Sequence, residues 1–171
     1  MNLKTPRLGD SLIAVGLLVV ALVAALADHE PVLEPNRDWD LFGLLLLAGQ
    51  TLPLVWRQSY PRAVAWATLI AWGVSVGIGY QSTAGIFGVL IALYGLAAYL
   101  PRRVALIHGG SVLALMLAWT GVGLLVAEHY VPWSAFVEIA FGVALPMAMG
   151  FVDRQRTERL TELERTQTEA L

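Results

Sequence analysis

Residues 104–127 read VALIHGGSVLALMLAWTGVGLLVA and contain no lysine, arginine, aspartate or glutamate. The hydrocarbon core of a bilayer is about 30 Å thick, so a membrane-spanning helix needs about 20 predominantly apolar residues. This stretch is long enough to meet that requirement. A lone strand there would leave its backbone groups unpaired, because lipid offers no water to bind them. The stretch therefore predicts a transmembrane helix.

Five other stretches share this apolar character. They are residues 11–27, 41–56, 63–79, 84–100 and 135–152, the last interrupted only by Glu138. Over the whole chain 57% of the residues are hydrophobic and only 14% are charged, whereas soluble domains are about 25% charged. We therefore predict an all-α integral membrane protein, in which residues 1–152 form a bundle of six transmembrane helices. Pro53 predicts a kink near the end of the second helix.

The basic residues predict how this bundle is oriented. Connections on the cytoplasmic side of membrane proteins are enriched in lysine and arginine. Ten of the 11 lysines and arginines lie in one set of alternating segments, which are the two termini and the connections after the second and fourth predicted helices. The remaining one, Arg37, lies in the connection after the first predicted helix. The two short basic turns of that set contain Arg57, Arg62, Arg102 and Arg103. We therefore predict a multi-pass protein of the cytoplasmic membrane, with both termini in the cytoplasm.

The start of the chain allows a second interpretation. Lys4 and Arg7 precede an apolar run that ends in Ala25-Leu26-Ala27, which is the arrangement of a cleavable secretory signal. Against it, the apolar run is at the long limit for such a signal and Asp10 adjoins it. Cleavage would leave five spans, and the C-terminus would still lie in the cytoplasm.

Residues 153–171, DRQRTERLTELERTQTEAL, are polar and contain neither glycine nor proline. Arginine, glutamate, leucine and glutamine are good helix formers. The sequence therefore predicts that the sixth transmembrane helix continues unbroken into the cytoplasm. Leu160 and Leu163 begin a 3-4-3 spacing, which is typical of the seam of a coiled coil and predicts a homodimer. The alternative is a solvated basic anchor that contacts no partner helix.

Few residues within or beside the spans can carry chemistry. Glu138 is the one acidic residue inside a predicted span, and such residues are candidates for a functional role. His29 and His129 lie in the outer connections among carboxylates, where they could bind a metal ion or respond to pH. A solvated acidic loop explains the same residues. Gly73 and Gly77 form a G-x-x-x-G pattern that allows two helices to approach closely.

The sequence excludes several classes of function. No cysteine is present, so a thiolate metal site or a cysteine nucleophile is impossible. The chain contains no G-x-S-x-G motif, no phosphate-binding loop and no regular spacing of metal ligands. A net charge of −2 provides no basic field for a nucleic acid. We therefore expect no catalytic residues, no cofactor and no nucleic-acid partner.

Three segments carry a resemblance to a known family. They are LPLVWRQSYPRAVA at residues 52–65, LAAYLPRRVAL at residues 96–106 and RQRTERLTELER at residues 154–165. Together they resemble the N-terminal membrane region of actinobacterial sensor histidine kinases, the type paired with helix-turn-helix response regulators. The resemblance implies a sensory input module whose last helix leads to a dimerisation helix and an ATP-binding domain. No histidine follows His129, so no phospho-accepting residue can be assigned in this chain.

Two other functions fit the size and predicted topology. One is a six-span component of a small-solute transporter, and the other is a membrane scaffold that stabilises a partner complex. The predicted interior has few polar groups with which to hold a polar solute, and a charged tail has no evident use in a transporter. These observations favour the sensory module over the transporter, and the scaffold stays open.

Overall fold

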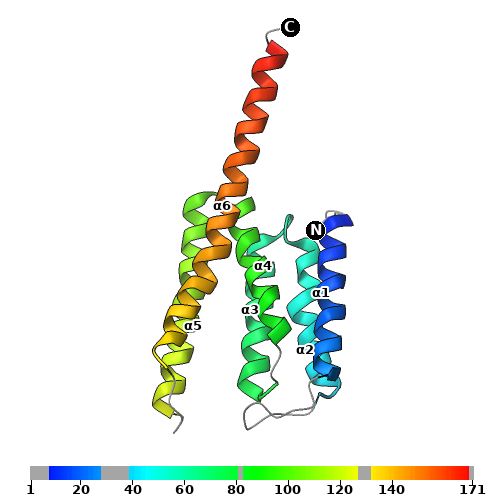
Figure 1. Ribbon diagram of the computed structural model, residues 1–171, viewed down its shortest axis with the longest axis vertical. Coiled ribbons are helices and arrows are strands. Elements are labelled where there is room, and N and C mark those ends of the chain that lie inside the picture. The colour runs from blue at the N-terminus through cyan, green and yellow to red at the C-terminus, as the bar shows by residue number, and fades with distance from the viewer. Residues whose placement is uncertain (1–7, 28–38, 81–82, 127–131, 170–171) are drawn as a thin grey trace. The chain divides into compact units, whose positions relative to one another are not determined.

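The computed structural model describes residues 8–27, 39–80, 83–126 and 132–169, and these ranges contain helices but no strand. The prediction of an all-α protein is confirmed. The elements are α1 (Leu8–Ala27), α2 (Leu41–Thr51), the 3-10 helix η1 (Leu52–Trp56), α3 (Pro61–Ile78), α4 (Thr83–Tyr99), α5 (Arg102–Val126) and α6 (Ser134–Glu169) (Figure 1). Helices α1, α3, α5 and α6 are long and apolar enough to cross a membrane, and α2 with η1 and α4 are shorter apolar helices.

Local sequence explains where several helices begin and end. Asp40 caps the start of α2, because its side chain accepts a hydrogen bond of 2.9 Å from the Gly43 amide. Pro61 occupies the first turn of α3, where its missing N–H group costs nothing. Gly79 ends α3 with a left-handed φ of 93°, a conformation that glycine adopts without strain.

The second apolar stretch changes its helical form instead of remaining one α-helix. Helix α2 ends at Thr51, and the chain continues as η1. Pro53 lies at the start of η1 and has no N–H group with which to continue the α-helical hydrogen bonds. The structure therefore changes from α-helix to 3-10 helix at the residue where the sequence predicts a kink.

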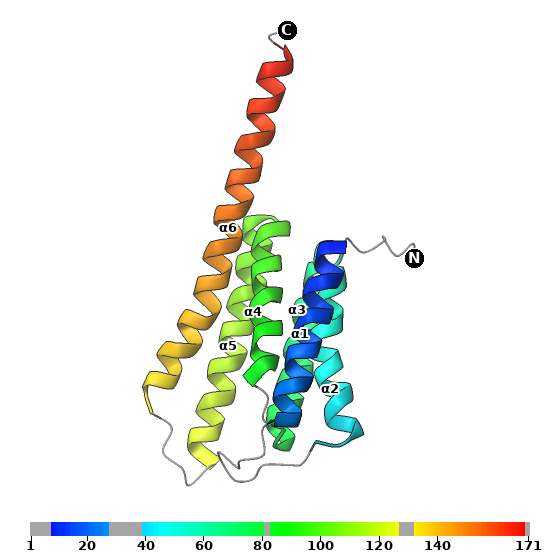
Figure 2. The ribbon, with the colours of Figure 1, turned by 45° about the vertical axis from the view of Figure 1, so that its right-hand side comes forward.

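The chain divides into two compact units, and the first is Met1–Ala92. Within it α2 contacts α3, and α1 contacts both α2 and η1 (Figure 2). Leu47 is fully buried among the helices together with Ala21 and Ala25. The first half of α4 approaches α2 closely, because a Cβ atom at Gly88 would lie 2.4 Å from the Gln50 carbonyl oxygen.

The second unit, Leu93–Leu171, contains the end of α4 together with α5 and α6. Helix α5 packs against α6, and a Cβ atom at Gly109 would lie 2.7 Å from the Met147 Cε atom. Helix α6 runs unbroken from its apolar part through the charged tail to Glu169, which confirms the predicted continuity. It also contains Pro146, which removes one backbone hydrogen bond without ending the helix.

Candidate functional site

The point at which α6 changes from apolar to charged residues is held to the end of α4. The Tyr94 hydroxyl donates a hydrogen bond of 2.6 Å to the Asp153 carboxylate. The next residue of α6, Arg154, donates to the backbone carbonyl of Leu100, directly after α4. We name these four residues, together with Gly150, the exit clamp.

Gly150 brings the two helices of the exit clamp together. A Cβ atom at this position would lie 2.5 Å from the Tyr94 carbonyl oxygen and 3.0 Å from the Ala98 amide nitrogen. Both neighbours are backbone atoms, so no side-chain rotation can make room. The absence of a side chain at Gly150 therefore allows the close crossing that brings Asp153 within reach of the Tyr94 hydroxyl.

Arg154 adds a charged contact to the clamp. Its guanidinium lies at the carboxyl end of α4, where the helix dipole places partial negative charge. The same side chain donates to Glu158 at 2.7 Å, and the two side chains are 33% and 56% exposed. An exposed pair of this kind contributes about 0–1 kcal/mol to stability. Arg154 therefore acts mainly by joining α6 to the end of α4, and Glu158 orients it.

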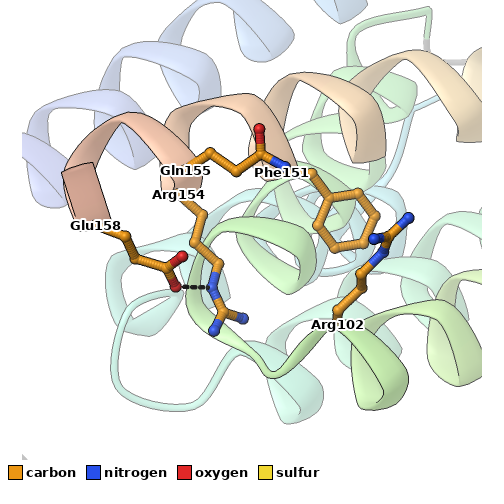
Figure 3. Close-up of a pocket in the computed structure, with 5 residues that line it drawn as sticks. All are labelled: Arg102, Phe151, Arg154, Gln155 and Glu158. Carbon is orange, nitrogen blue, oxygen red and sulfur yellow. Dashed lines mark hydrogen bonds and ion pairs between the residues drawn. The ribbon is translucent and has the colours of Figure 1, made fainter.

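A pocket opens beside the exit clamp. It has a volume of about 200 Å³. Its lining residues are Arg102, Phe151, Arg154, Gln155 and Glu158 (Figure 3). We name it the exit pocket. Because Arg102 is the first residue of α5, the exit pocket lies between the start of α5 and the middle of α6.

A buried polar cluster lies in the first unit. Gln50 of α2 is fully buried, and its Nε2 atom donates a 2.6 Å hydrogen bond to the Ser75 hydroxyl of α3. Its Oε1 atom has no hydrogen-bond partner among the described residues and lies against Gly85, where a Cβ atom would be 1.8 Å away. A buried amide stabilises a fold only while it is hydrogen-bonded. The contact between α2 and α3 therefore depends on the hydrogen bond that Gln50 donates to Ser75.

Replacing Ser75 with alanine is expected to lower the free energy of unfolding by about 1–3 kcal/mol, because the buried Gln50 amide loses its nearest partner. Titration with SDS in mixed micelles, followed by tryptophan fluorescence, measures this change. Ser111→Ala is the matched control, since the Ser111 hydroxyl is exposed and bonds only the Ile107 carbonyl of its own helix. Equal stability of the two variants would contradict a structural role for the Gln50–Ser75 hydrogen bond.

Two further polar contacts connect distant parts of the first unit. The Arg57 Nε atom lies 2.8 Å from an Asp10 carboxylate oxygen, and the side chains are only 12% and 3% exposed. The Tyr80 hydroxyl donates a 2.5 Å hydrogen bond to Asp40. Asp10 and Arg57 join the start of α1 to the turn after η1. Tyr80 and Asp40 join the end of α3 to the start of α2.

The structure does not bring the candidate sensing residues into one site. His29 and His129 lie outside the described residues. Glu138 is exposed on α6, with no hydrogen bond or ion pair among the described residues. The described ranges also contain no group of three histidine or acidic residues that could hold a metal ion.

Among the described residues of the single chain, the close packing expected at Gly73 is not found. A Cβ atom at Gly73 would meet no atom within 4 Å, and Gly77 is exposed. The glycines that do allow close approach within the described ranges include Gly85, Gly88 and Gly150. Spacing alone failed here because it does not determine which face of a helix meets a neighbour.

The basic anchors differ in their surroundings. Arg57 is in the buried pair with Asp10, and Arg102 lines the exit pocket. Arg102 is itself exposed, as are Arg62 and Arg103. In the tail, Leu160 and Leu163 are 62% and 61% exposed, so the residues predicted to form a dimer seam are uncovered in the single chain.

Sequence reasoning did not find the exit clamp. Tyr94 lies in an apolar span where its hydroxyl has no sequence signature, and Asp153 reads as the first residue of a solvated tail. They are 59 positions apart. The one available signal was the sharp change from Val152 to Asp153, which marks the end of the apolar part of α6 but does not indicate a partner residue.

One comparison with known proteins gives a match. Residues 3–159 match a family described as "Domain of unknown function (DUF7134)". No curated protein and no solved structure matches the chain. The matched range contains both units' helices, the whole exit clamp and the exit pocket, and ends within the charged part of α6.

Proposed function

The chain belongs to the DUF7134 family, and from the resemblance of three of its segments to sensor histidine kinases we propose that it is the membrane sensory input module of a two-component sensor histidine kinase. In this proposal the helices sense a stimulus in the membrane or at the outer connections. Helix α6 then passes the signal to a cytoplasmic kinase region. The kinase and its response regulator are the proposed partners.

The continuity of α6 is the observation that carries the proposal. This helix extends over 36 residues, from an apolar part to a charged part, without interruption. The exit clamp fixes the helix at the boundary between those parts through Asp153 and Arg154. A rearrangement at the clamp would therefore shift or rotate the whole tail, because a helix transmits displacement along its axis.

The proposed six-span topology agrees with two contacts. The Asp10–Arg57 pair brings the start of α1 to the same end as the first basic turn. The contact of Arg154 with Leu100 brings the second basic turn to the same end as the start of the tail. We propose that both of these ends face the cytoplasm, where positive charge is enriched.

Single cysteines test this topology directly, because the natural chain has none. A cysteine at Arg103 is expected to be protected from a membrane-impermeant maleimide in intact cells and labelled after permeabilisation. A cysteine at Trp133, which is 74% exposed, is expected to be labelled in intact cells. Labelling of both positions in intact cells would overturn the proposed orientation.

The tail supports a proposed homodimer. Its two leucines are more than half exposed on an otherwise charged helix, and a second tail could cover them. Dimerisation would place two kinase regions together. This arrangement matches the dimerisation helix that the resemblance to sensor kinases implies.

The function is tested by joining residues 1–171 to the dimerisation and catalytic regions of a histidine kinase and measuring autophosphorylation in membranes. Asp153→Asn weakens the hydrogen bond with Tyr94 by about 1 kcal/mol, so basal output is expected to change by about fivefold. Glu162→Gln is the matched control, since it removes an equal charge from the exposed tail. Equal output from both variants would argue against signalling through the clamp.

A further inference from the structure

The exit pocket lies where two helices change from apolar to polar sequence. On α6, Phe151 belongs to the last apolar turn, and Arg154, Gln155 and Glu158 belong to the charged part. On α5, Arg102 precedes the apolar residues of that helix. The pocket therefore lies at the level where the headgroups of a bilayer meet its hydrocarbon core.

The lining of the pocket has the chemistry of an anion site with one apolar wall. Arg102 and Arg154 carry two positive charges, and Glu158 carries one negative charge. Glu158 is bound by the Nε atom of Arg154. Arg102 makes no hydrogen bond or ion pair with any described residue. Arg102 and Phe151 both line this pocket (Figure 3), so the charge of Arg102 and the apolar surface of Phe151 border one space.

Arginine binds phosphate well, because its planar guanidinium donates two parallel hydrogen bonds to two oxygens. Arg154 uses its Nε atom for Glu158 and one terminal nitrogen for the Leu100 carbonyl. Its other terminal nitrogen has no partner among the residues that the structure describes. Donors from Arg102, Arg154 and the Gln155 amide are therefore available around one volume of about 200 Å³.

We propose that the exit pocket binds the phosphate of an anionic phospholipid headgroup. Free inorganic phosphate offers the same oxygens but has no apolar atoms to pack against the Phe151 ring. A phospholipid places its glycerol and acyl carbons beside that ring. Binding at this point would add a ligand to the same residues that hold α6 to α4. The regulatory consequence rests on the proposed function, while the binding itself does not.

The test uses the full chain purified in detergent with phosphatidylglycerol, and native mass spectrometry counts the lipids that remain bound. Phosphatidylcholine is the zwitterionic comparison lipid. Arg102→Gln removes a lining charge, and Arg103→Gln removes an equal charge from the neighbouring exposed residue outside the lining. Retention is expected to fall about fivefold in Arg102→Gln only, which corresponds to about 1 kcal/mol.

Three outcomes decide the proposal. Preferential retention of one phosphatidylglycerol that is lost in Arg102→Gln and kept in Arg103→Gln supports it. Equal losses in both variants overturn it, because the attraction would then come from the general basic surface. Displacement of the lipid by millimolar inorganic phosphate also overturns it, since free phosphate would then be the preferred ligand.

The fate of this proposal can be separated from that of the proposed function. If lipid retention falls in Arg102→Gln only while Asp153→Asn leaves kinase output unchanged, the lipid site is supported and the proposed sensory function is contradicted. If Asp153→Asn changes kinase output while Arg102→Gln leaves lipid retention unchanged, the proposed function is supported and the lipid site is contradicted. Thermal unfolding of the Arg102→Gln chain, expected to match that of Arg103→Gln, confirms that both variants are folded.

Discussion

Replacing Asp10 with alanine is expected to destabilise the first unit by about 3–5 kcal/mol. The change removes the Asp10 carboxylate, which lies 2.8 Å from the Nε atom of Arg57, a side chain only 12% exposed. A buried charge that loses its partner keeps the full cost of leaving water. The free energy of unfolding is measured by SDS titration in mixed micelles. It is expected to fall by more than it does for a substitution at the protein surface.

The control for this prediction is Arg62→Ala. Arg62 belongs to the same basic turn but is exposed, so its loss is expected to change stability by less than about 0.5 kcal/mol. The double variant Asp10→Ala/Arg57→Leu is expected to recover part of the loss, because the largely buried guanidinium is removed together with the carboxylate. A small effect of Asp10→Ala, equal to that of Arg62→Ala, would show that the pair is solvated and structurally unimportant.

The second large effect is expected at Gly150. A methyl group there would lie 2.5 Å from the Tyr94 carbonyl oxygen and 2.8 Å from the Ala97 Cβ atom. Since backbone and Cβ atoms cannot rotate away, α6 must move from α4. Gly150→Ala is therefore expected to lower the unfolding free energy of the protein by about 1–3 kcal/mol.

Gly142→Ala gives a control of opposite sign in the same helix. A Cβ atom at Gly142 would meet nothing within 4 Å, and alanine favours a helix over glycine by about 1 kcal/mol. This variant is expected to be as stable as the natural chain or more stable. An increase in stability in both variants would contradict the close approach of α6 and α4 at Gly150.

The sequence predicted the helices well because their main signal is local. Uncharged stretches of membrane-spanning length appear as helices within a few residues of the expected bounds, for example α3 at Pro61–Ile78 against the predicted 63–79. The change of helical form lies at Pro53, where a kink was predicted. The continuous α6 also followed from local sequence, because no glycine or proline occurs between Asp153 and Glu169.

The contacts between helices were not predictable in the same way. Asp10 and Arg57 are 47 positions apart, and each has a sufficient local explanation as a residue near a membrane boundary. The G-x-x-x-G pattern at Gly73 fits close packing, yet Gly150 provides such a contact without any pattern. Which residues meet depends on how helices rotate about their axes, and a single sequence does not fix that rotation.

The exit clamp and the exit pocket share Arg154, so the two proposals concern one place on the molecule. Hydrogen bonds from Tyr94 and to Leu100 hold α6 against α4. A headgroup bound between Arg102 and Arg154 would add a ligand at the terminal nitrogen of Arg154 that the clamp does not use. Lipid composition is therefore one route by which the clamp could be tightened or released.

The central claim is that the clamp acts on the cytoplasm through a continuous helix. The most direct test inserts seven residues between Glu158 and Arg159 of the kinase fusion, either alanine-rich or glycine-serine-rich, and measures how Asp153→Asn changes autophosphorylation. Seven residues nearly preserve the phase of a coiled coil, so the length is matched and only rigidity differs. We predict that Asp153→Asn changes output by about fivefold with the alanine-rich insert and has no effect with the flexible one. An equal response with the flexible insert would contradict transmission through α6.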